Sequence, residues 1–420
     1  MRTTLSAIFV VLLLTGGLVA EKPPSLAIHS LRVLDVRSGA TTEGYVVVRG
    51  DRILSIDRSA PSGLRIIELG NATVLPGLID CHVHLEADWN DFSATGNLRR
   101  SSAEKTLIAL QNAQTYLQRG FTTVRDAGTT DPAYDTIALR NAIARGAFAG
   151  PRVIAAGVPI SVTGGHADLN ALAPDVPMVR LPNIADTPDE VRIAVRHDLR
   201  NGVDWIKLMA TGGVGDALSD YNVQELSDEQ MKAAVEVAHR AGRNVMAHAE
   251  GTAGITAAVR AGVDSIEHGT MLDDETAQLM AERGTWLVPT LETFQRGVEI
   301  GLSSGQEPIM LEKGKAILRY QQPAFERALR HHVKIAYGLD DEPKFTTREF
   351  QALVTAGLTP LQALQTATTN AAALLRVDAG SLDAGKIADV IAIEGDPLKD
   401  VKALEKVVFV MKSGVVVRQH

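Results

Sequence analysis

The sequence predicts an α/β protein, a closed (β/α)8 TIM barrel joined to a small β-sandwich domain built from both chain ends. Eight apolar runs alternate with helical patterns between Thr73 and Asp341, which indicates parallel strands covered by helices. Short β-like runs separated by Gly, Asp and Asn flank this region on both sides. A doubly wound open sheet is the alternative, but the chain has no GxGxxG-type loop to favour it.

The first 20 residues differ in kind from the rest of the chain. Arg2 precedes an apolar stretch from Ala7 to Leu14, and small residues continue to Ala20. This order is typical of a secretory signal peptide, and so short an apolar stretch does not favour a membrane anchor. We therefore expect residues 1–20 to be removed and the protein to be exported, to the periplasm or as a secreted protein.

The two segments that flank the barrel carry the β-like runs. Residues 21–75 contain "LAIHSLRVLDV", "GYVVVRGDRILSID" and "RIIELGNATVL", and residues 373–420 contain "ADVIAIEGDP" and "VVFVMKSGVVVRQH". Each segment alone would leave strand edges and an apolar face exposed. The prediction is therefore one small β-sandwich domain formed from both segments, with residues 76–372 forming the barrel.

The eight barrel strands are expected at a series of apolar runs. In chain order these are "TVLPGLIDCHVH", "GFTTVRDAG", "PRVIAAGVPI", "VDWIKLMATGG", "RNVMAHAE", "VDSIEHG", "TWLVPT" and "VKIAYGLDD". Helical patterns such as "SDEQMKAAVEVAHRAG" and "TAGITAAVRAG" lie between them, each closing on a glycine that ends a helix. Ser227 or Asp228 marks the expected start of the first of these helices.

Composition excludes some classes of partner. The chain has 45% hydrophobic and 22% charged residues, as a globular protein does, and its formal net charge is -8. An acidic chain without Lys/Arg blocks does not favour nucleic acid, or an anionic membrane once the signal is removed. Cys81 is the only cysteine, so an intrachain disulfide is impossible, and we interpret it as a small buried residue.

Polar residues follow several of the expected strands, at the end where a barrel has its active site. His82 and His84 are two apart, so alternation puts them on one face of their strand and Cys81 on the other. The corresponding residues further along the chain are Lys207, His248, His268 and Asp340. Each alone could be a satisfied loop histidine, a helix-capping aspartate or a lysine that reaches water. Their convergence at one end of a barrel indicates metal binding instead.

Lys207 is informative because an ammonium group cannot bind a metal ion. A neutral lysine amine can react with CO2 to give a carbamate, an anionic oxygen ligand able to bridge two metal ions. The run around Lys207 indicates apolar surroundings on the barrel side, which would lower the lysine pKa and favour that reaction.

The motifs "PGLIDCHVH", "IEHG", "GLDD" and "GSLDAGKIADVIAIEGDP", together with Lys207 and His248, resemble the binuclear metal-dependent amidohydrolase superfamily. Within it, "TTVRDAG", "TGGH" and "WIKLMATGGV" are similar to the prolidase-like group. That group includes Xaa-Pro and Xaa-Arg/Lys carboxypeptidase-type enzymes, imidazolonepropionase-like proteins and ochratoxin-hydrolysing amidohydrolases. The resemblance covers nearly the whole chain after residue 20. Leu339 departs from it, because many members have Thr or Ser before the aspartate.

The resemblance implies two divalent metal ions, for which zinc is the expected metal. Carried over by position, the ligands of the more buried ion would be His82, His84 and Asp340, those of the other ion would be His248 and His268, and carboxylated Lys207 would bridge them. Two such ions lower the pKa of a bridging water and leave hydroxide available near pH 7. Asp340 would accept its proton and deliver it to the leaving amine.

The implied reaction is hydrolysis of the amide bond of a dipeptide or N-acyl amino acid with a free C-terminal carboxylate, ochratoxin-type N-acyl aromatic amino acids included. His166 in "SVTGGHAD" would stabilise the oxyanion or bind that carboxylate. Tyr221, in the loop after the fourth strand, is a second candidate for the carboxylate. Besides this small substrate, we expect a second copy of the chain as partner, in a homo-oligomer.

The substrate side chain stays open between proline, aromatic or apolar, and Arg/Lys. The loop "EADWNDFSATGN" offers Glu86, Asp88 and Asp91 to a cationic side chain, and Trp89 and Phe92 to an apolar one. Loop carboxylates of this kind are usually solvated, so the acidic residues do not decide the question.

Three other functions are weighed against this one. A cyclic amide hydrolase, as in imidazolonepropionase, would use a similar site. A mononuclear deaminase of the same barrel would lack the bridging lysine and use a glutamate near the fifth strand, where Glu250 is the only one nearby. A structural protein that has lost its metal ligands is disfavoured, because all six ligand residues are present.

Overall fold

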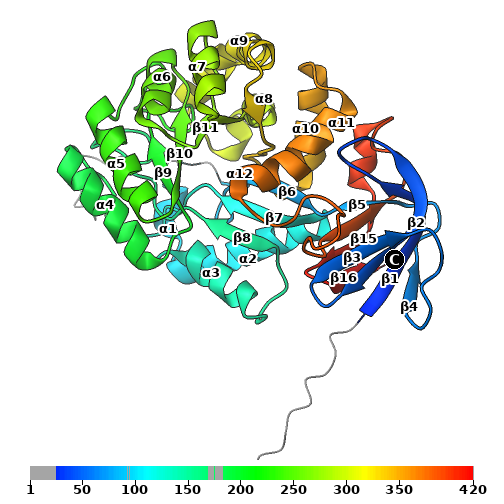
Figure 1. The fold of residues 1–420 in the computed structure, drawn as a ribbon. Helices are drawn as coiled ribbons and strands as arrows, with labels where there is room; N and C mark the ends of the chain where they lie inside the picture. Colours follow the sequence, from blue (N-terminus) through cyan, green and yellow to red (C-terminus); the bar gives the residue numbers. More distant parts are fainter. Residues whose placement is uncertain (1–24, 92, 94, 169–174, 176–182, 420) are drawn as a thin grey trace, which may run out of the picture.

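The computed structural model describes residues 25–419 except 92, 94, 169–174 and 176–182. The expected signal peptide at 1–20 and Phe92 therefore lie outside the described residues. The chain forms a mixed α/β structure with a larger region of parallel strands and helices and a smaller β region beside it (Figure 1).

The larger region contains a three-stranded and a five-stranded parallel sheet. The three-stranded sheet consists of β6 (Leu78–Val83), β7 (Phe121–Asp126) and β8 (Arg152–Ala155). The five-stranded sheet consists of β9 (Trp205–Met209), β10 (Asn244–Ala249), β11 (Ser265–His268), β12 (Trp286–Val288) and β13 (Lys334–Ile335). Each strand falls within one of the eight expected apolar runs, so these runs are confirmed as strands.

Backbone hydrogen bonds join the two sheets at both edges. At one edge, the N–H of Cys81 in β6 donates to the carbonyl of Tyr337 just after β13, over 2.8 Å. At the other edge, the N–H of Ile160, after β8, donates to the carbonyl of Lys207 in β9, over 2.9 Å. The carboxyl ends of all these strands consequently face one side of the larger region.

Helices alternate with these strands along the chain and lie outside them (Figure 1). Their bounds are α1 Gly96–Arg99, α2 Ser102–Gln118, α3 Asp135–Ala144, α4 Pro188–Asn201, α5 Asp228–Arg240, α6 Thr252–Ala261, α7 Asp274–Arg283, α8 Leu291–Ile300, α9 Pro308–Arg330, α10 Thr346–Thr355, α11 Pro360–Gln365 and α12 Ala371–Leu375. The expected start of α5 is confirmed, because the Ser227 and Gln230 side chains each accept a hydrogen bond from the other's backbone N–H.

The smaller region is a single hydrogen-bonded sheet of eight strands drawn from both ends of the chain. From the first segment come β1 (Ser25–Leu34), β2 (Thr41–Arg49), β3 (Arg52–Asp57), β4 (Arg65–Glu68) and β5 (Thr73–Pro76). From the last segment come β14 (Val390–Ile393), β15 (Val407–Lys412) and β16 (Val415–Gln419). The two groups meet where β5 pairs with β14, and residues such as Ile28, Val46, Val390 and Phe409 share one buried cluster.

Gly77 divides the run "LPGLIDCHVH" between the two regions. The run was expected to be one strand, but β5 ends at Pro76 in the small sheet and β6 begins at Leu78. A Cβ atom at Gly77 would lie 2.3 Å from the hydroxyl oxygen of Thr122. A glycine is therefore required where the chain passes from the small sheet to the parallel strands.

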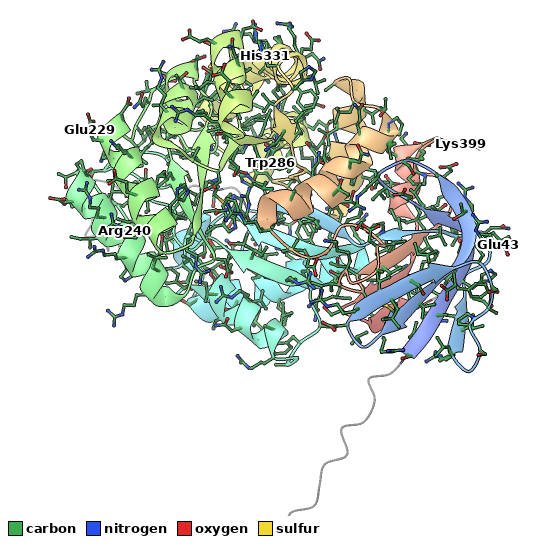
Figure 2. All side chains as sticks on the ribbon, viewed as in Figure 1. Glu43, Glu229, Arg240, Trp286, His331 and Lys399 are labelled. Carbon is green, nitrogen blue, oxygen red and sulfur yellow. The ribbon has the colours of Figure 1, made fainter. Side chains whose placement is uncertain are left out.

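Charged side chains lie mainly on the outside of the molecule. Glu229 and Arg240 project from the outer helix α5, whereas Trp286 lies among the strands (Figure 2). Across the residues that the structure describes, none of the helices combines the length and the apolar character needed to span a bilayer.

Candidate metal centre

The four expected histidines and Asp340 lie together at the carboxyl ends of the parallel strands. The ring centroid of His82 is 5.4 Å from that of His84 and 5.1 Å from that of His268, and the His248 and His268 centroids are 4.8 Å apart. An Oδ1 atom of Asp340 lies 3.5 Å from Nε2 of His84 and 3.7 Å from Nε2 of His82. Residues from four different strands or strand ends thus meet in one place.

One ring nitrogen of each histidine is held by a hydrogen bond, which leaves the other available to a ligand. Nδ1 contacts Glu267 Oε2 at 2.7 Å in His82, the Gly128 carbonyl at 3.0 Å in His84 and Thr290 Oγ1 at 2.6 Å in His268. In His248 it is Nε2 that contacts the Gly212 carbonyl, at 3.0 Å. Metal-binding histidines usually have this arrangement, because the outer partner fixes the tautomer and the ring orientation.

Burial keeps these histidines neutral. It lowers the pKa of His84 to about 4 and lowers the pKa of His82, His248 and His268 well below the usual value, with nearby cationic groups acting in the same direction. A metal ion binds the neutral imidazole, so the electrostatics agree with the hydrogen bonds. Potential ligand atoms of His82, His268 and Asp340 also lie within 4.8 Å of one another, a spacing that one metal ion can bridge.

Lys207 is buried, with 1% of its surface exposed. Burial lowers its pKa to about 8, although the nearby Glu267 and Asp340 carboxylates favour the charged form. The expected lowering of the Lys207 pKa is therefore confirmed and is caused by burial, but the surroundings are not purely apolar, since charged groups lie around this lysine. At pH 7 roughly a tenth of lysines with such a pKa are neutral, so the reactive amine is present.

Asp340 and two of its neighbours have unusual backbone conformations. Asp340, His268 and Thr290 have φ angles of 53°, 68° and 45°, which non-glycine residues rarely adopt. The Asp340 N–H donates to the His82 carbonyl over 2.9 Å, and the Thr293 hydroxyl donates to the Asp340 carbonyl over 2.7 Å. Burial raises the pKa of the Asp340 carboxyl to about 7. Such local strain is typical of functional sites.

Simple alternation predicted that Cys81 lies on the strand face opposite His82 and His84. The structure does not place it there. It shares a buried cluster with Trp205 and Met246, each two residues before a site residue on its own strand. The pairing of β6 with β7 shifts register between Asp80 and Val83, and a β-bulge re-aims the side chains that follow it. The bulge thus lets Cys81 pack inward as the expected small apolar residue beneath the inward-facing histidines.

Sequence reasoning missed a buried ion pair beneath the histidines. Arg125 in β7 and Glu267 in β11 are both fully buried, and their Nη2 and Oε1 atoms are 2.9 Å apart. The Arg125 Nε–H donates to the Cys81 carbonyl over 2.6 Å, and its guanidinium lies 4.5 Å from the centroid of the Trp205 ring. The other oxygen of Glu267 holds His82. The sequence did contain a signal for this ion pair, because Arg125 and Glu267 are charged residues inside otherwise apolar strand runs.

Glu250, the glutamate near the fifth strand, also lies at the candidate centre. Potential ligand atoms of His248, Glu250 and His268 lie within 4.8 Å of one another. The glutamate is completely buried, and burial raises the pKa of its carboxyl to about 8 although the Thr270 hydroxyl favours the charged form.

His166 lies beside the histidine cluster, where the sequence predicted it. Its ring centroid is 4.5 Å from that of His248, and its Nδ1 lies 2.5 Å from Oδ2 of Asp216. A Cβ atom at Gly213 would lie 2.5 Å from Nε2 of His166, so a glycine there makes room for the ring. The ammonium group of Lys313 in α9 donates to the carbonyls of residues 213, 216 and 219 and so holds this loop.

Tyr221 lies slightly further from the histidines. It is 8% exposed and packs in an apolar cluster with Phe294 and Ile317. The Phe294 ring is 5.8 Å from that of His268, so Tyr221 belongs to the apolar wall next to the candidate centre.

The acidic residues of the loop after β6 have partners within the protein. Glu86 accepts hydrogen bonds from the Thr129 and Thr130 hydroxyls, each over 2.7 Å. Asp88 and Asp91 both pair with Arg100. These three acids, which the sequence offered to a cationic substrate side chain, are therefore engaged in holding the loop.

The fold and the site define a class of protein: an α/β protein with a histidine- and aspartate-rich candidate metal centre at the carboxyl ends of its parallel strands. Residues 73–417 match the amidohydrolase family, and the chain belongs to it. The expectation of an enzyme that hydrolyses C–N bonds is thereby confirmed.

Individual relatives agree with the expected prolidase-like group. The chain is 36% identical over 358 residues to ochratoxinase of Aspergillus niger, covering 79% of this chain and 72% of the relative. Its structure is similar to that of a Xaa-Pro dipeptidase with bound methionine in the active site, with a TM-score of 0.87, 34% identity and coverage of 94% and 100% of the two chains. It is 25% identical over 368 residues to imidazolonepropionase of Pseudomonas putida (strain GB-1), covering 78% and 80%.

Proposed function

We propose that the protein is a binuclear metal-dependent hydrolase that cleaves the amide bond of a dipeptide or N-acyl amino acid with a free C-terminal carboxylate. The observation that carries this proposal is the cluster of four histidines around Asp340, three of them buried and His84 partly exposed, each with one ring nitrogen fixed by a hydrogen bond and the other available. The eight parallel strands would form a closed (β/α)8 barrel, supported by the hydrogen bonds at both sheet edges, and the eight-stranded sheet would fold as a β-sandwich.

The residues present fit two divalent ions, and zinc suits their imidazole and carboxylate donors. The proposed ligands of one ion are His82, His84 and Asp340, those of the other are His248 and His268, and carboxylated Lys207 lies between them. His268 is also within ligand distance of His82 and Asp340, which supports a compact arrangement of both ions. The buried lysine, with a pKa of about 8, supplies the neutral amine that carboxylation needs.

A pair of divalent ions bound here would supply an activated water and polarise the scissile carbonyl. The protein's own groups handle the proton. A carboxylate oxygen of Asp340 takes a proton from the attacking water and passes it to the leaving amine nitrogen, a transfer suited to its pKa of about 7. Glu267 and Thr290 hold His82 and His268 in place during this transfer.

The substrate carboxylate is assigned to His166 and Tyr221, next to the histidine cluster. Asp216 contacts Nδ1 of His166 and so orients the ring beside His248. The internal pairing of Glu86 and of Asp88 with their neighbours favours a proline, aromatic or apolar side chain over Arg or Lys. The names of the similar ochratoxinase and Xaa-Pro dipeptidase agree with an amide bond to an amino acid.

A cyclic amide is the second candidate substrate. The likeness to imidazolonepropionase favours it, and the same site could attack a ring amide. A mononuclear deaminase is less well supported, because Lys207 lies among the proposed ligands.

Cellular location and assembly follow from the sequence. We propose export to the periplasm or secretion after cleavage of residues 1–20, a homo-oligomeric state, and no nucleic-acid or membrane partner in the mature protein.

The test is a screen of N-acyl amino acids and dipeptides, each paired with its C-terminal amide, on the zinc-loaded protein. The proposal expects hydrolysis of the acids and a much lower kcat/KM for the matched amides. In His166→Asn, the preference for acid over amide should shrink through a higher KM. Equal rates on acid and amide forms would refute carboxylate recognition, and activity confined to cyclic amides would establish the second candidate.

A further inference from the structure

We infer that Glu250 supplies a carboxylate ligand to the metal ion held by His248 and His268. This inference deepens the proposed function and rests on it, because it concerns the second of the two proposed ions.

The backbone fixes Glu250 next to the proposed ligands. It directly follows β10, two residues after His248, so strand alternation extends both side chains to the same side. The Glu250 N–H donates to the Thr211 hydroxyl over 3.0 Å, and its carbonyl accepts from the Met271 N–H over 2.9 Å. Its position is therefore set by neighbouring loops as well as by its own strand.

The carboxylate of Glu250 needs a partner that the protein's own groups do not provide. The residue is 0% exposed. Neither carboxylate oxygen meets a hydrogen-bond partner of ordinary geometry in the described part of the chain, although the Thr270 hydroxyl is close enough to favour the charged form. Burying a carboxylate without a cation or hydrogen bonds is costly, and a metal ion would remove that cost.

Three potential ligand atoms lie close together. Atoms of Glu250, His248 and His268 lie within 4.8 Å of one another, whereas ligands bound to one ion at about 2.0–2.2 Å lie roughly 3–4.4 Å apart. A small movement of these side chains would bring the three ligand atoms within this range. His248 Nε2 and His268 Nδ1 are already engaged with Gly212 and Thr290, so Nδ1 of His248 and Nε2 of His268 are the nitrogens available to this ion.

With Glu250, the second ion gains a protein carboxylate in addition to two imidazoles and the bridging lysine. Two histidines and one carboxylate are a common ligand set for catalytic zinc. Without Glu250, this ion would have only two ligands of its own, one fewer than the ion at His82, His84 and Asp340.

The experiment is a Co2+ titration of the metal-free protein, with a competing chelator to measure each affinity and the visible absorption of Co2+ to report its coordination. Glu250→Gln keeps the size of the side chain but removes the anionic ligand. It should weaken one of two tight sites by at least about tenfold and change the absorption spectrum of that site. Asp198→Asn alters another buried carboxyl, on α4 against Tyr134 and Asn183, and should match wild type.

Glu250→Asp keeps the charge on a shorter side chain and covers the case in which Glu250→Gln does not fold; it too should weaken one site. Two tight sites with wild-type affinity and spectrum in the Glu250 variants would overturn the inference while leaving the proposed function intact. Fewer than two tight sites in the wild-type protein would overturn the proposed binuclear centre and this inference together.

Discussion

Asp340 combines a strained backbone, a side chain that is only 18% exposed and direct proximity to two histidines. Its Oδ1 lies 3.7 Å and 3.5 Å from the available nitrogens of His82 and His84, and its pKa of about 7 suits proton transfer near neutral pH. These properties assign it two tasks, as a metal ligand and as the group that carries the proton.

Replacing Asp340 with Asn separates the two tasks. The amide keeps an oxygen that can bind metal but cannot accept the proton, so kcat should fall by about 10²–10⁴-fold with a much smaller loss of metal. Steady-state kinetics and elemental analysis of the same preparation would show this. Asp198→Asn is the matched control for loss of a buried carboxyl, and near-normal turnover of Asp340→Asn would assign the proton to another residue.

At the residue scale, the sequence predicted those side chains that lie at the carboxyl end of an apolar strand run. His82, His84, His248 and His268 could be found this way because strand ends converge in parallel sheets. The hydrogen bond of Glu86 and the ion pair of Asp88 could not be predicted from the sequence, because they depend on where Thr129 and Arg100 lie in space.

At the scale of elements, Arg125 in β7 connects three other parallel strands. It bonds to the backbone of β6, pairs with Glu267 on β11 and lies against Trp205 of β9. Through Glu267 the same network reaches His82. The parallel strands and the candidate centre are thus held by one buried set of charges.

Arg125→Met should lower the free energy of unfolding by about 3–5 kcal/mol, because it leaves the Glu267 carboxylate buried without its cation. Urea denaturation would measure the loss. Arg140→Met removes the partner of Asp204 in a pair that is only partly buried, and should cost about 1 kcal/mol or less. Similar losses in the two variants would contradict a structural role specific to the buried pair.

Periodicity predicted the eight strands and the start of α5, because long alternations and capping residues are local signals. The bulge in β6 was not predictable in this way. Nothing in "IDCHVH" departs from simple alternation, and the extra residue is visible only in the pairing of β6 with β7.

At the scale of the whole molecule, both ends of the described chain contribute to one sheet, and Gly77 leads from that sheet into the parallel strands. The joint sheet could be expected from the sequence because each set of strands alone would expose an apolar face. Within the described residues, β1 begins at Ser25 and pairs with β2, with a register shift between Ser30 and Val33.

Export predicts a mature chain that begins near Glu21. N-terminal sequencing or intact-mass measurement of the protein from the exported fraction should show the loss of residues 1–20. An exported protein that still carries Met1 would contradict both the cleavage and the assignment of these residues as a signal peptide.

Elemental analysis of the wild-type protein and of Lys207→Ala tests most directly whether Lys207 bridges two metal ions. The other five ligands proposed for these ions are His82, His84, His248, His268 and Asp340. We expect two ions per chain in the wild type and loss of the binuclear centre and of activity in the variant. Short carboxylic acids that replace the carbamate should restore part of the activity. Two tightly held ions in Lys207→Ala would contradict the bridging role, and a wild-type chain with a single ion or none would contradict the binuclear centre itself.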